Sequence, residues 1–446
     1  MKILGKLAVL TAVAALCLIQ SCINVDHTLG SGYVPGNQDI SVSVDEIPLP
    51  VGLSMSDSIQ TNLGQAGVFG AINTAMCGKF QAEAAFSITP THDSLVIGGD
   101  PVFKEMYAVL SIDGTQAIST SEKIIPQNIH AYQLNVALDS TLIYNNSITP
   151  DKYGPASILK ENAIYTGGDQ IKLYFNEEFA SPILRMTPKQ LDSAKLFMEN
   201  FHGIVIKTDD IEELDLGGRL NRINLAYSYI ELTYTSTNSS GIRRDTTVEF
   251  SLGAHYSVCR YTSSTESYAD ENPADALYYE GFCGVKPRIS AKALKGAMQK
   301  WAAGKGLDLN RVLLTKASVV FPFEYLGDGE YYKAYPSNLF PCRRYRDSTN
   351  RVTFCPIEEI ADASMDHGEI NLSLFEYKSD ASIYVQKILR TDDKDISPLD
   401  DIWMMGTYSD AYGSYIDYRN YSMGVLNGTD ADRSPYLRFT YSILLD

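Results

Sequence analysis

Apolar and polar side chains alternate along much of the chain, and a period of two residues is typical of strands with one buried face. The stretch Tyr107-Ala108-Val109-Leu110-Ser111-Ile112 lies in a strand predicted at 103–113. Further strands are predicted at 40–44, 129–136, 170–175, 203–207, 222–225, 229–234, 312–323, 368–377, 383–389, 414–425 and 436–445. Between the last two, Asn427-Gly428 predicts a type I′ hairpin. The pattern predicts a mainly β protein.

Two stretches instead repeat their apolar residues at helical spacing. In the first, Thr187 and Gln190 have the spacing of a capping box with Pro188 in the first turn, and the apolar face comprises Leu191, Ala194, Met198 and Phe201. The second begins at Ser290, and its face comprises Leu294, Ala297, Met298 and Trp301. A few helices among many strands favour β-sandwiches over alternating βαβ units.

A short internal repeat links the two halves of the chain. Pro126-Gln127-Asn128-Ile129 followed by Asp139-Ser140-Thr141 is echoed by Pro336-Ser337-Asn338-Leu339 followed by Asp347-Ser348-Thr349. Matches this short arise by chance as well as by duplication. With this repeat, the strand pattern predicts two tandem domains of β-sandwich or jelly-roll type, at 46–255 and 256–446.

The N-terminus has the features of a bacterial lipoprotein signal. Lys2 and Lys6 precede an apolar run that stops at Ser21-Cys22. We expect residues 1–21 to be removed, Cys22 to be acylated with diacylglycerol and a further chain such as palmitate, and 22–45 to form a tether. A plain transmembrane anchor fits less well, because the apolar run is short and polar residues follow at once.

Charge and cysteine content limit the partners and the chemistry. The 446 residues carry a formal charge of -17, and loss of Lys2 and Lys6 with the signal makes it -19, which disfavours nucleic acid as a partner. Five cysteines remain beyond Cys22 and an extracytoplasmic location permits disulfides, so Cys342 with Cys355 and Cys259 with Cys283 are candidate bridges and Cys77 is left over. Any one of them could equally be a small buried apolar residue.

The sequence has no strong catalytic or metal-binding motif. It lacks GxSxG, HExxH and the phosphate loop GxxxxGK[ST], and its six histidines occur singly, at His27, His92, His130, His202, His255 and His367. Carboxylates cluster in 209–213, 392–395 and 400–401, where a pair could serve a glycosidase, although acidic runs are usually solvated loops. Calcium is an alternative ligand for Asp392-Asp393-Lys394-Asp395 or Asp430-Ala431-Asp432.

Aromatic residues give the last indication of a binding site. The chain has 29 tyrosines and 2 tryptophans, and one stretch near the C-terminus holds Trp403, Tyr408, Tyr412, Tyr415, Tyr418 and Tyr421. Such residues form a ligand platform when they are exposed, because sugars and protein partners both offer apolar faces with polar edges. The alternative is that these residues pack inside the sheets, since strands favour tyrosine.

The order of several segments resembles a family of Bacteroidota lipoproteins catalogued as domain of unknown function 4270. The segments are 92–97, 129–134, 140–146, 170–184, 200–206, 278–281 and 310–317, and the resemblance runs from about residue 55 to the end. It implies an outer-membrane lipoprotein with a β-rich body and brings no catalytic residues. Members exported to the cell surface usually carry several acids after the acylated cysteine, whereas 23–27 has only Asp26, so the outward side is favoured only modestly.

These observations predict a non-enzymatic outer-membrane lipoprotein that acts as a binding or assembly module of a cell-envelope protein complex. Glycan capture on the aromatic stretch is the alternative, and a glycoside hydrolase is a distant third. No cofactor is predicted apart from the calcium alternative.

Overall fold

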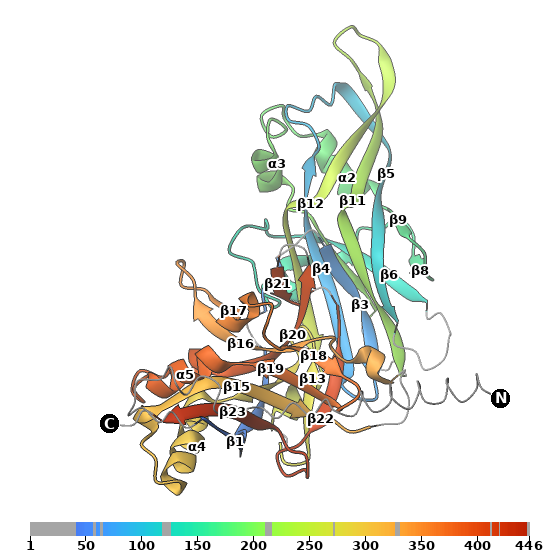
Figure 1. Cartoon of the computed structure of the whole chain (residues 1–446). Helices are drawn as coiled ribbons and strands as arrows, with labels where there is room; N and C mark the ends of the chain where they lie inside the picture. Colours follow the sequence, from blue (N-terminus) through green and yellow to red (C-terminus); the bar gives the residue numbers. More distant parts are fainter. Residues whose placement is uncertain are drawn as a thin grey trace, which may run out of the picture.

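A computed structural model describes residues 42–56, 59–62, 66–117, 126–209, 216–270, 273–325, 331–410, 413–418 and 420–443. Strands make up 52% and helices 16% of the structure, which confirms the predicted mainly β class. Every strand pairing is antiparallel, and the sheets stack as β-sandwich-like layers (Figure 1). No helix within these ranges combines the length and the apolar character that a bilayer crossing requires.

The first half is one ten-stranded sheet. Its strands are β3 (Ala66–Thr74), β4 (Gly78–Pro90), β5 (Gly99–Ala117), β6 (Gln127–Leu134), β7 (Tyr153–Ser157), β8 (Ala163–Tyr165), β9 (Gln170–Tyr174), β10 (Ile204–Thr208), β11 (Gly217–Thr237) and β12 (Arg243–Ser263). Two helices, α2 (Glu177–Leu184) and α3 (Ala194–Asn200), pack their phenylalanines into its core. The β11–β12 hairpin reaches the top of Figure 1.

The second half consists of a five-stranded and a six-stranded sheet around a second core. The five-stranded sheet contains β1 (Val42–Pro48), β15 (Val312–Pro322), β18 (His367–Asn371), β19 (Glu376–Asp380) and β23 (Tyr436–Ile443). The six-stranded sheet contains β2 (Val51–Met55), β14 (Val285–Ile289), β16 (Leu339–Arg346), β17 (Val352–Pro356), β20 (Ile402–Asp410) and β21 (Gly413–Ile416). β13 (Ala276–Glu280) pairs with β22 (Met423–Asn427), and the helices are α4 (Ala291–Gly304) and α5 (Ser382–Arg390).

Six short 3₁₀ turns complete the described elements. They are Pro150–Lys152, Thr265–Asp270, Leu309–Arg311, Tyr331–Ala334, Glu358–Ala361 and Pro398–Asp400.

The same order of strands occurs in both halves. In the first half the neighbours run β9-β5-β11-β3-β4-β10-β6-β7, with β12 as a second connection between β11 and β4 and with β8 paired to β6. In the second half the five-stranded sheet includes the order β19-β15-β23-β1, and the six-stranded sheet includes the order β2-β14-β20-β16-β17. β1 and β2 follow each other in the chain, so together they take the place of β3 in the first half. In each half a helix follows the strand at the same place, α2 after β9 and α5 after β19. This shared topology supports duplication as the source of the internal repeat.

The repeated sequence motifs adopt the same local structure. The Asp139 carboxylate accepts hydrogen bonds from the amide and the hydroxyl of Thr141, at 2.7 and 2.6 Å. Asp347 and Thr349 form the same turn with distances of 2.8 and 2.7 Å. The two turns lie close together, because Arg351 joins Asp347 to the carbonyl of Ser140. The short motifs are therefore equivalent Asx turns.

The two halves share buried surface, and their limits differ from the prediction. Phe80 of β4 packs against Phe282 and Tyr421, which belong to the second half, with ring centroids 5.6 and 4.9 Å apart. Residues 46–55 were assigned to the first domain, but they pair with β23 and β14 of the second. The single strand β12 also spans the predicted boundary at 255/256, with a bulge in its pairing there.

One of the local predictions considered next is confirmed and three need correction. In addition, the strand predicted at 368–377 is divided between β18 and β19, and the one predicted at 414–425 is divided between β21 and β22. The helix after Ser290 is present as α4, with Ser290 as its N-cap. Thr187 and Gln190 do bond to each other, but they form a turn, and the helix starts only at Ala194. Residues 383–389 were predicted as a strand and form α5, in which four apolar side chains are buried on one helical face. Asn427-Gly428 does not connect a hairpin, because β22 pairs with β13 while β23 pairs with β1 and β15.

Candidate functional site

The aromatic stretch near the C-terminus does not form an exposed platform. Trp403 is only 2% exposed, and its ring lies between the guanidinium groups of Arg288 and Arg344, whose carbons are 5.4 and 5.1 Å from the ring centroid. Phe354 meets it edge-on at 5.3 Å. The prediction of Trp403 as a ligand-binding residue is therefore wrong, since its ring faces are covered by the protein.

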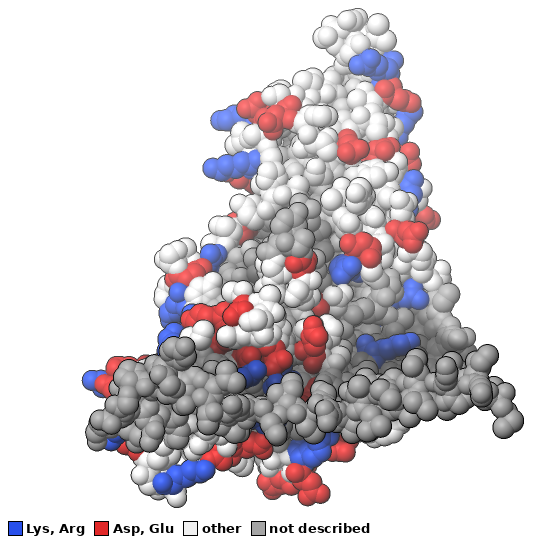
Figure 2. All heavy atoms as spheres, in the orientation of Figure 1, with Lys and Arg blue, Asp and Glu red and all other residues white. Residues whose placement is uncertain are grey.

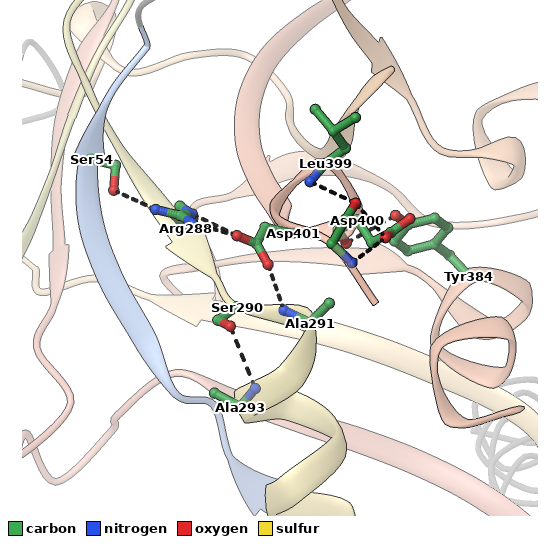
Figure 3. A network of polar contacts seen from close by, with 10 residues as sticks. Ser54, Arg288, Ser290, Ala291, Ala293, Tyr384, Leu399, Asp400 and Asp401 are labelled. Carbon is green, nitrogen blue, oxygen red and sulfur yellow. Dashed lines mark hydrogen bonds and ion pairs between the residues drawn. The ribbon is translucent and has the colours of Figure 1, made fainter. Parts of the chain in front are cut away.

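The polar network around Arg288 explains why Trp403 is held inside. Asp401 accepts two hydrogen bonds from the Arg288 guanidinium, one at 2.9 Å, and a third from the amide of Ala291 at 2.8 Å (Figure 3). Asp400 caps the adjacent turn through Ser397. The predicted acidic pair at 400–401 thus anchors α4 and its neighbouring turn to the sheet instead of facing solvent.

The tyrosines of the same stretch are divided between surface and interior. Tyr408 and Tyr415 pack against each other across β20 and β21 with centroids 5.6 Å apart, and Tyr415 is 40% exposed. Tyr418 is half-buried, and burial raises its pKa. Tyr412 lies outside the described residues, as does the lipidation residue Cys22. Of the predicted ligand platform, only Tyr408 and Tyr415 form an adjacent pair among the described residues.

The five cysteines among the described residues are free thiols in the structure, so the predicted disulfides are not formed. Cys342 lies opposite Pro356 and Cys355 lies opposite Arg343, so the two thiols project to opposite faces of their sheet. Cys259 instead accepts a hydrogen bond from the amide of Val68 at 3.3 Å within the core. Four of them serve as small buried side chains, and Cys355 is partly exposed.

The remaining acidic runs are partly bonded to groups of the protein and partly exposed. In the predicted calcium loop at 392–395, Asp393 pairs with Lys295 at 2.7 Å. Asp209 bonds to Asn128 and His130, and residues 210–215 lie outside the described ranges. Asp430 and Asp432 are both exposed. Across the described parts of the chain, no group of three or more His, Cys, Asp or Glu residues is arranged to hold a metal ion.

A buried ionic cluster joins the two halves. The Glu280 carboxylate is fully buried and accepts hydrogen bonds from the hydroxyls of Ser263, Thr265 at 2.7 Å and Tyr421 at 2.6 Å. The Lys286 ammonium, equally buried, donates to nearby carbonyls, among them those of Phe282 at 3.2 Å and Gly284 at 3.0 Å, and to Ser56. Gly284 is required here, because a Cβ would lie 2.0 Å from the Glu280 carboxylate.

Burial governs the titration of this cluster. Desolvation raises the pKa of Glu280, although its three hydroxyl partners oppose the shift. Desolvation lowers the pKa of Lys286, and the attraction of Glu280 opposes that shift. The cluster is sealed from solvent, so we assign it to the stability of the junction.

An opening lies where the two longest described strands, β11 and β12, separate. Residues 225–228 of β11 stand opposite the single residue Leu110 of β5. Residues 253–256 of β12 likewise stand opposite the single residue Ser87 of β4. We call these two four-residue bulges together the fork. Above it β11 and β12 pair with each other, and below it they pair with β3 and β4.

Serine hydroxyls hold both bulges in shape. Ser228 donates to the carbonyl of Asn224 at 2.7 Å and accepts from the amide of Ser111 at 2.9 Å, which replaces the missing ladder bond to β5. Ser87 accepts from the amide of Tyr256 at 3.0 Å in the other bulge. Paired bulges of this kind are built features that redirect side chains.

The fork encloses a cavity of about 630 Å³. Its lining is polar and aromatic, and its described residues are Asn62, Leu225, Ala226, Tyr227, Ser228, Tyr229, Glu249, Ser251, Leu252, Gly253, Ala254, His255, Tyr256 and Ser257. Tyr227 is 73% exposed at the rim. Gly253 has φ +68°, and a Cβ there would lie 2.9 Å from the Leu225 side chain, so glycine is favoured at this position of the cavity lining.

A surface rich in tyrosine continues from the mouth of the cavity across the sheet. Tyr229 of β11 pairs with Val109 of β5, and the neighbouring row contains Glu231, Tyr107 and Tyr174. The Lys172 ammonium lies over the rings of two tyrosines, 3.5 Å from the ring centroid of Tyr107 and 4.8 Å from that of Tyr174. A hydrogen bond to the Glu231 carboxylate raises the pKa of Tyr107 to about 12. Figure 2 shows acidic and basic side chains interspersed on the face it presents.

One feature of the sequence indicates the fork. Strands were predicted at 222–225 and 229–234, and the structure joins them into β11 with the bulge between them. The interruption of the alternating pattern at 226–228 therefore marked the site. Nothing comparable marked Gly253 and His255 of β12.

No family model matches the chain, and no curated protein matches it. The resemblance to domain of unknown function 4270 therefore stays a prediction.

Proposed function

We propose that this chain is a non-enzymatic, lipid-anchored binding module of the outer membrane. The fork carries the proposal, because it is a preformed cavity open to solvent and its shape is fixed by side-chain hydrogen bonds. The buried carboxylates Glu280, Asp401 and Glu83, by contrast, are bonded within the fold. The apolar N-terminal run ending at Cys22 supports the lipid anchor.

An accessory role in an envelope protein complex is supported by a second feature. Val42 and Leu313 flank Ser442 on the outer face of the five-stranded sheet, and Val44 follows on β1. These three apolar side chains are 62%, 42% and 64% exposed. Val42 and Val44 lie on β1, the strand that begins the described body, and Leu313 lies on β15, with β23 between the two strands. If Cys22 is acylated, β1 is the described strand that follows the anchor along the chain.

Surface labelling and protease shaving test the anchor and its side of the membrane. We expect the wild-type chain to incorporate labelled palmitate and to fractionate with the outer membrane, and Cys22→Ala to lose both properties. Shaving of intact cells would cleave a surface-exposed body and spare a periplasmic one. Membrane fractionation of Cys22→Ala equal to wild type would contradict the lipid anchor.

A further inference from the structure

The two bulges of the fork have the same length, and side-chain hydrogen bonds fix the conformation of both in the absence of a ligand. Each bulge places four residues opposite one, and one amide in each is held by a side chain: the Ala226 amide donates to Asn224 at 3.1 Å, and the Tyr256 amide donates to Ser87 at 3.0 Å. A cavity of about 630 Å³ falls within the range of about 300–1,000 Å³ typical of small-molecule sites. Little ordering cost is therefore left for a ligand to meet.

We propose that the fork binds a neutral saccharide, one or two rings of a glycan chain. This inference rests on the proposed binding function and names its ligand. Tyr227 stands exposed at the rim, where its ring can stack on the C–H face of a sugar. Asn62, Glu249 and His255 line the same cavity and offer the donors and acceptors that ring hydroxyls require.

The charge of the lining favours a neutral ligand. Among the described residues around the cavity there is no lysine or arginine, and Glu249 adds a negative charge. Phosphate, sulfate or uronate groups would therefore enter without a positive partner and beside a carboxylate, which disfavours them.

The backbone of the fork argues against a peptide strand as the ligand. Strand addition requires unpaired amides and carbonyls along an edge. The amides of Ala226 and Tyr256 already donate to Asn224 and Ser87, so the bulges present side chains instead. Beyond the cavity Lys172 covers the rings of Tyr107 and Tyr174, so stacking is confined to the mouth of the fork.

Affinity electrophoresis of the detergent-solubilised full chain tests the proposal. The probes are galactomannan, xyloglucan and dextran, which are neutral, and polygalacturonate, which is anionic. We expect retention on at least one neutral polymer, and titration calorimetry with its oligosaccharides then gives the affinity. Tyr227→Ala and His255→Ala should each weaken binding about tenfold or more, whereas Tyr345→Ala, an exposed tyrosine of the second half, should not.

The folding of the variants is checked by urea unfolding, and both substitutions remove exposed side chains, so the midpoints should match wild type. Retention that is equal in Tyr227→Ala, His255→Ala and wild type would place the saccharide elsewhere and overturn the inference, while the binding function would stand. Retention on polygalacturonate alone would overturn the neutral class.

Absence of retention on all four polymers would also overturn the inference. Crosslinking to an outer-membrane barrel in the same preparation would then leave the proposed function intact with a protein partner, and absence of both would overturn the function as well. Release of reducing ends that disappears in Glu249→Gln would replace binding by hydrolysis.

Discussion

Removing the ammonium of Lys286 should destabilise the junction between the halves. Glu280 and Lys286 are both fully buried, and their remaining partners are hydroxyls and carbonyls that carry no net charge. The Lys286 ammonium donates to the main-chain carbonyl of Glu280 and not to its carboxylate, so the two charges attract each other without direct contact. Removing one of them leaves the other buried charge uncompensated and costs about 3–5 kcal/mol. We therefore expect Lys286→Met and Glu280→Gln each to lower the free energy of unfolding by about that amount.

The double variant tests whether the two groups act as a pair. Lys286→Met combined with Glu280→Gln removes both charges, so its cost should fall about 2–3 kcal/mol short of the sum of the single costs. Urea unfolding followed by tryptophan fluorescence measures all four proteins, and Trp403 reports directly because it belongs to the same core as Phe282 and Tyr421. Strictly additive costs would refute the coupling.

The pH dependence of stability gives an independent check on the same pair. Burial lowers the pKa of Lys286 from 10.5 to about 8, so between these values the unfolded chain holds a proton that the folded protein has released. Stability contributed by this group therefore rises from pH 8 to pH 10.5 and is lowest below pH 8. The difference between wild type and Lys286→Met should shift by up to about 3 kcal/mol across this window. A constant difference would show that the ammonium is not desolvated.

Three further outcomes follow from other contacts. Trp403→Ala should lower stability by about 3–5 kcal/mol in urea unfolding and leave glycan retention unchanged, and lost retention with unchanged stability would restore the predicted platform. Ser228→Ala should cost about 1–3 kcal/mol and weaken glycan binding in calorimetry, since the Ser111 amide loses its acceptor; unaltered binding would show that the bulge does not depend on this hydroxyl. Maleimide labelling of the native protein should reach Cys355 before the fully buried Cys342, and labelling after unfolding without reductant should count all five thiols, whereas fewer would reveal a disulfide.

Local patterns in the sequence predicted elements whose stability is local. Alternation located β5, β9 and β15, and Ser290 located the start of α4, because a pleated strand and an N-cap depend on neighbouring residues. The helix α5 was missed because nine residues with four buried apolar side chains also fit a short strand. The helix is stabilised by packing against β15, and this contact cannot be predicted from the sequence of the segment alone.

The candidate site was harder to predict for a different reason. Counting aromatics singled out Trp403, but exposure depends on Arg288 and Arg344, which arrive from other strands. The fork likewise needs β5 and β4 to supply Ser111 and Ser87 at the matching height. Only the break in the alternating pattern at 226–228 can be recognised in the sequence.

The way the body begins has a mechanical consequence. β1 is the first described strand, and it lies antiparallel to the last strand, β23, over seven residue pairs from Val42↔Ser442 to Pro48↔Tyr436. If Cys22 holds the protein to a membrane, a pull on the body along β1 loads all of these pairs together in shear instead of opening them one at a time. The anchor at one end of the chain is thus clamped by the other end, and deletion of β23 would disconnect the body from its attachment even where the rest of the fold survived.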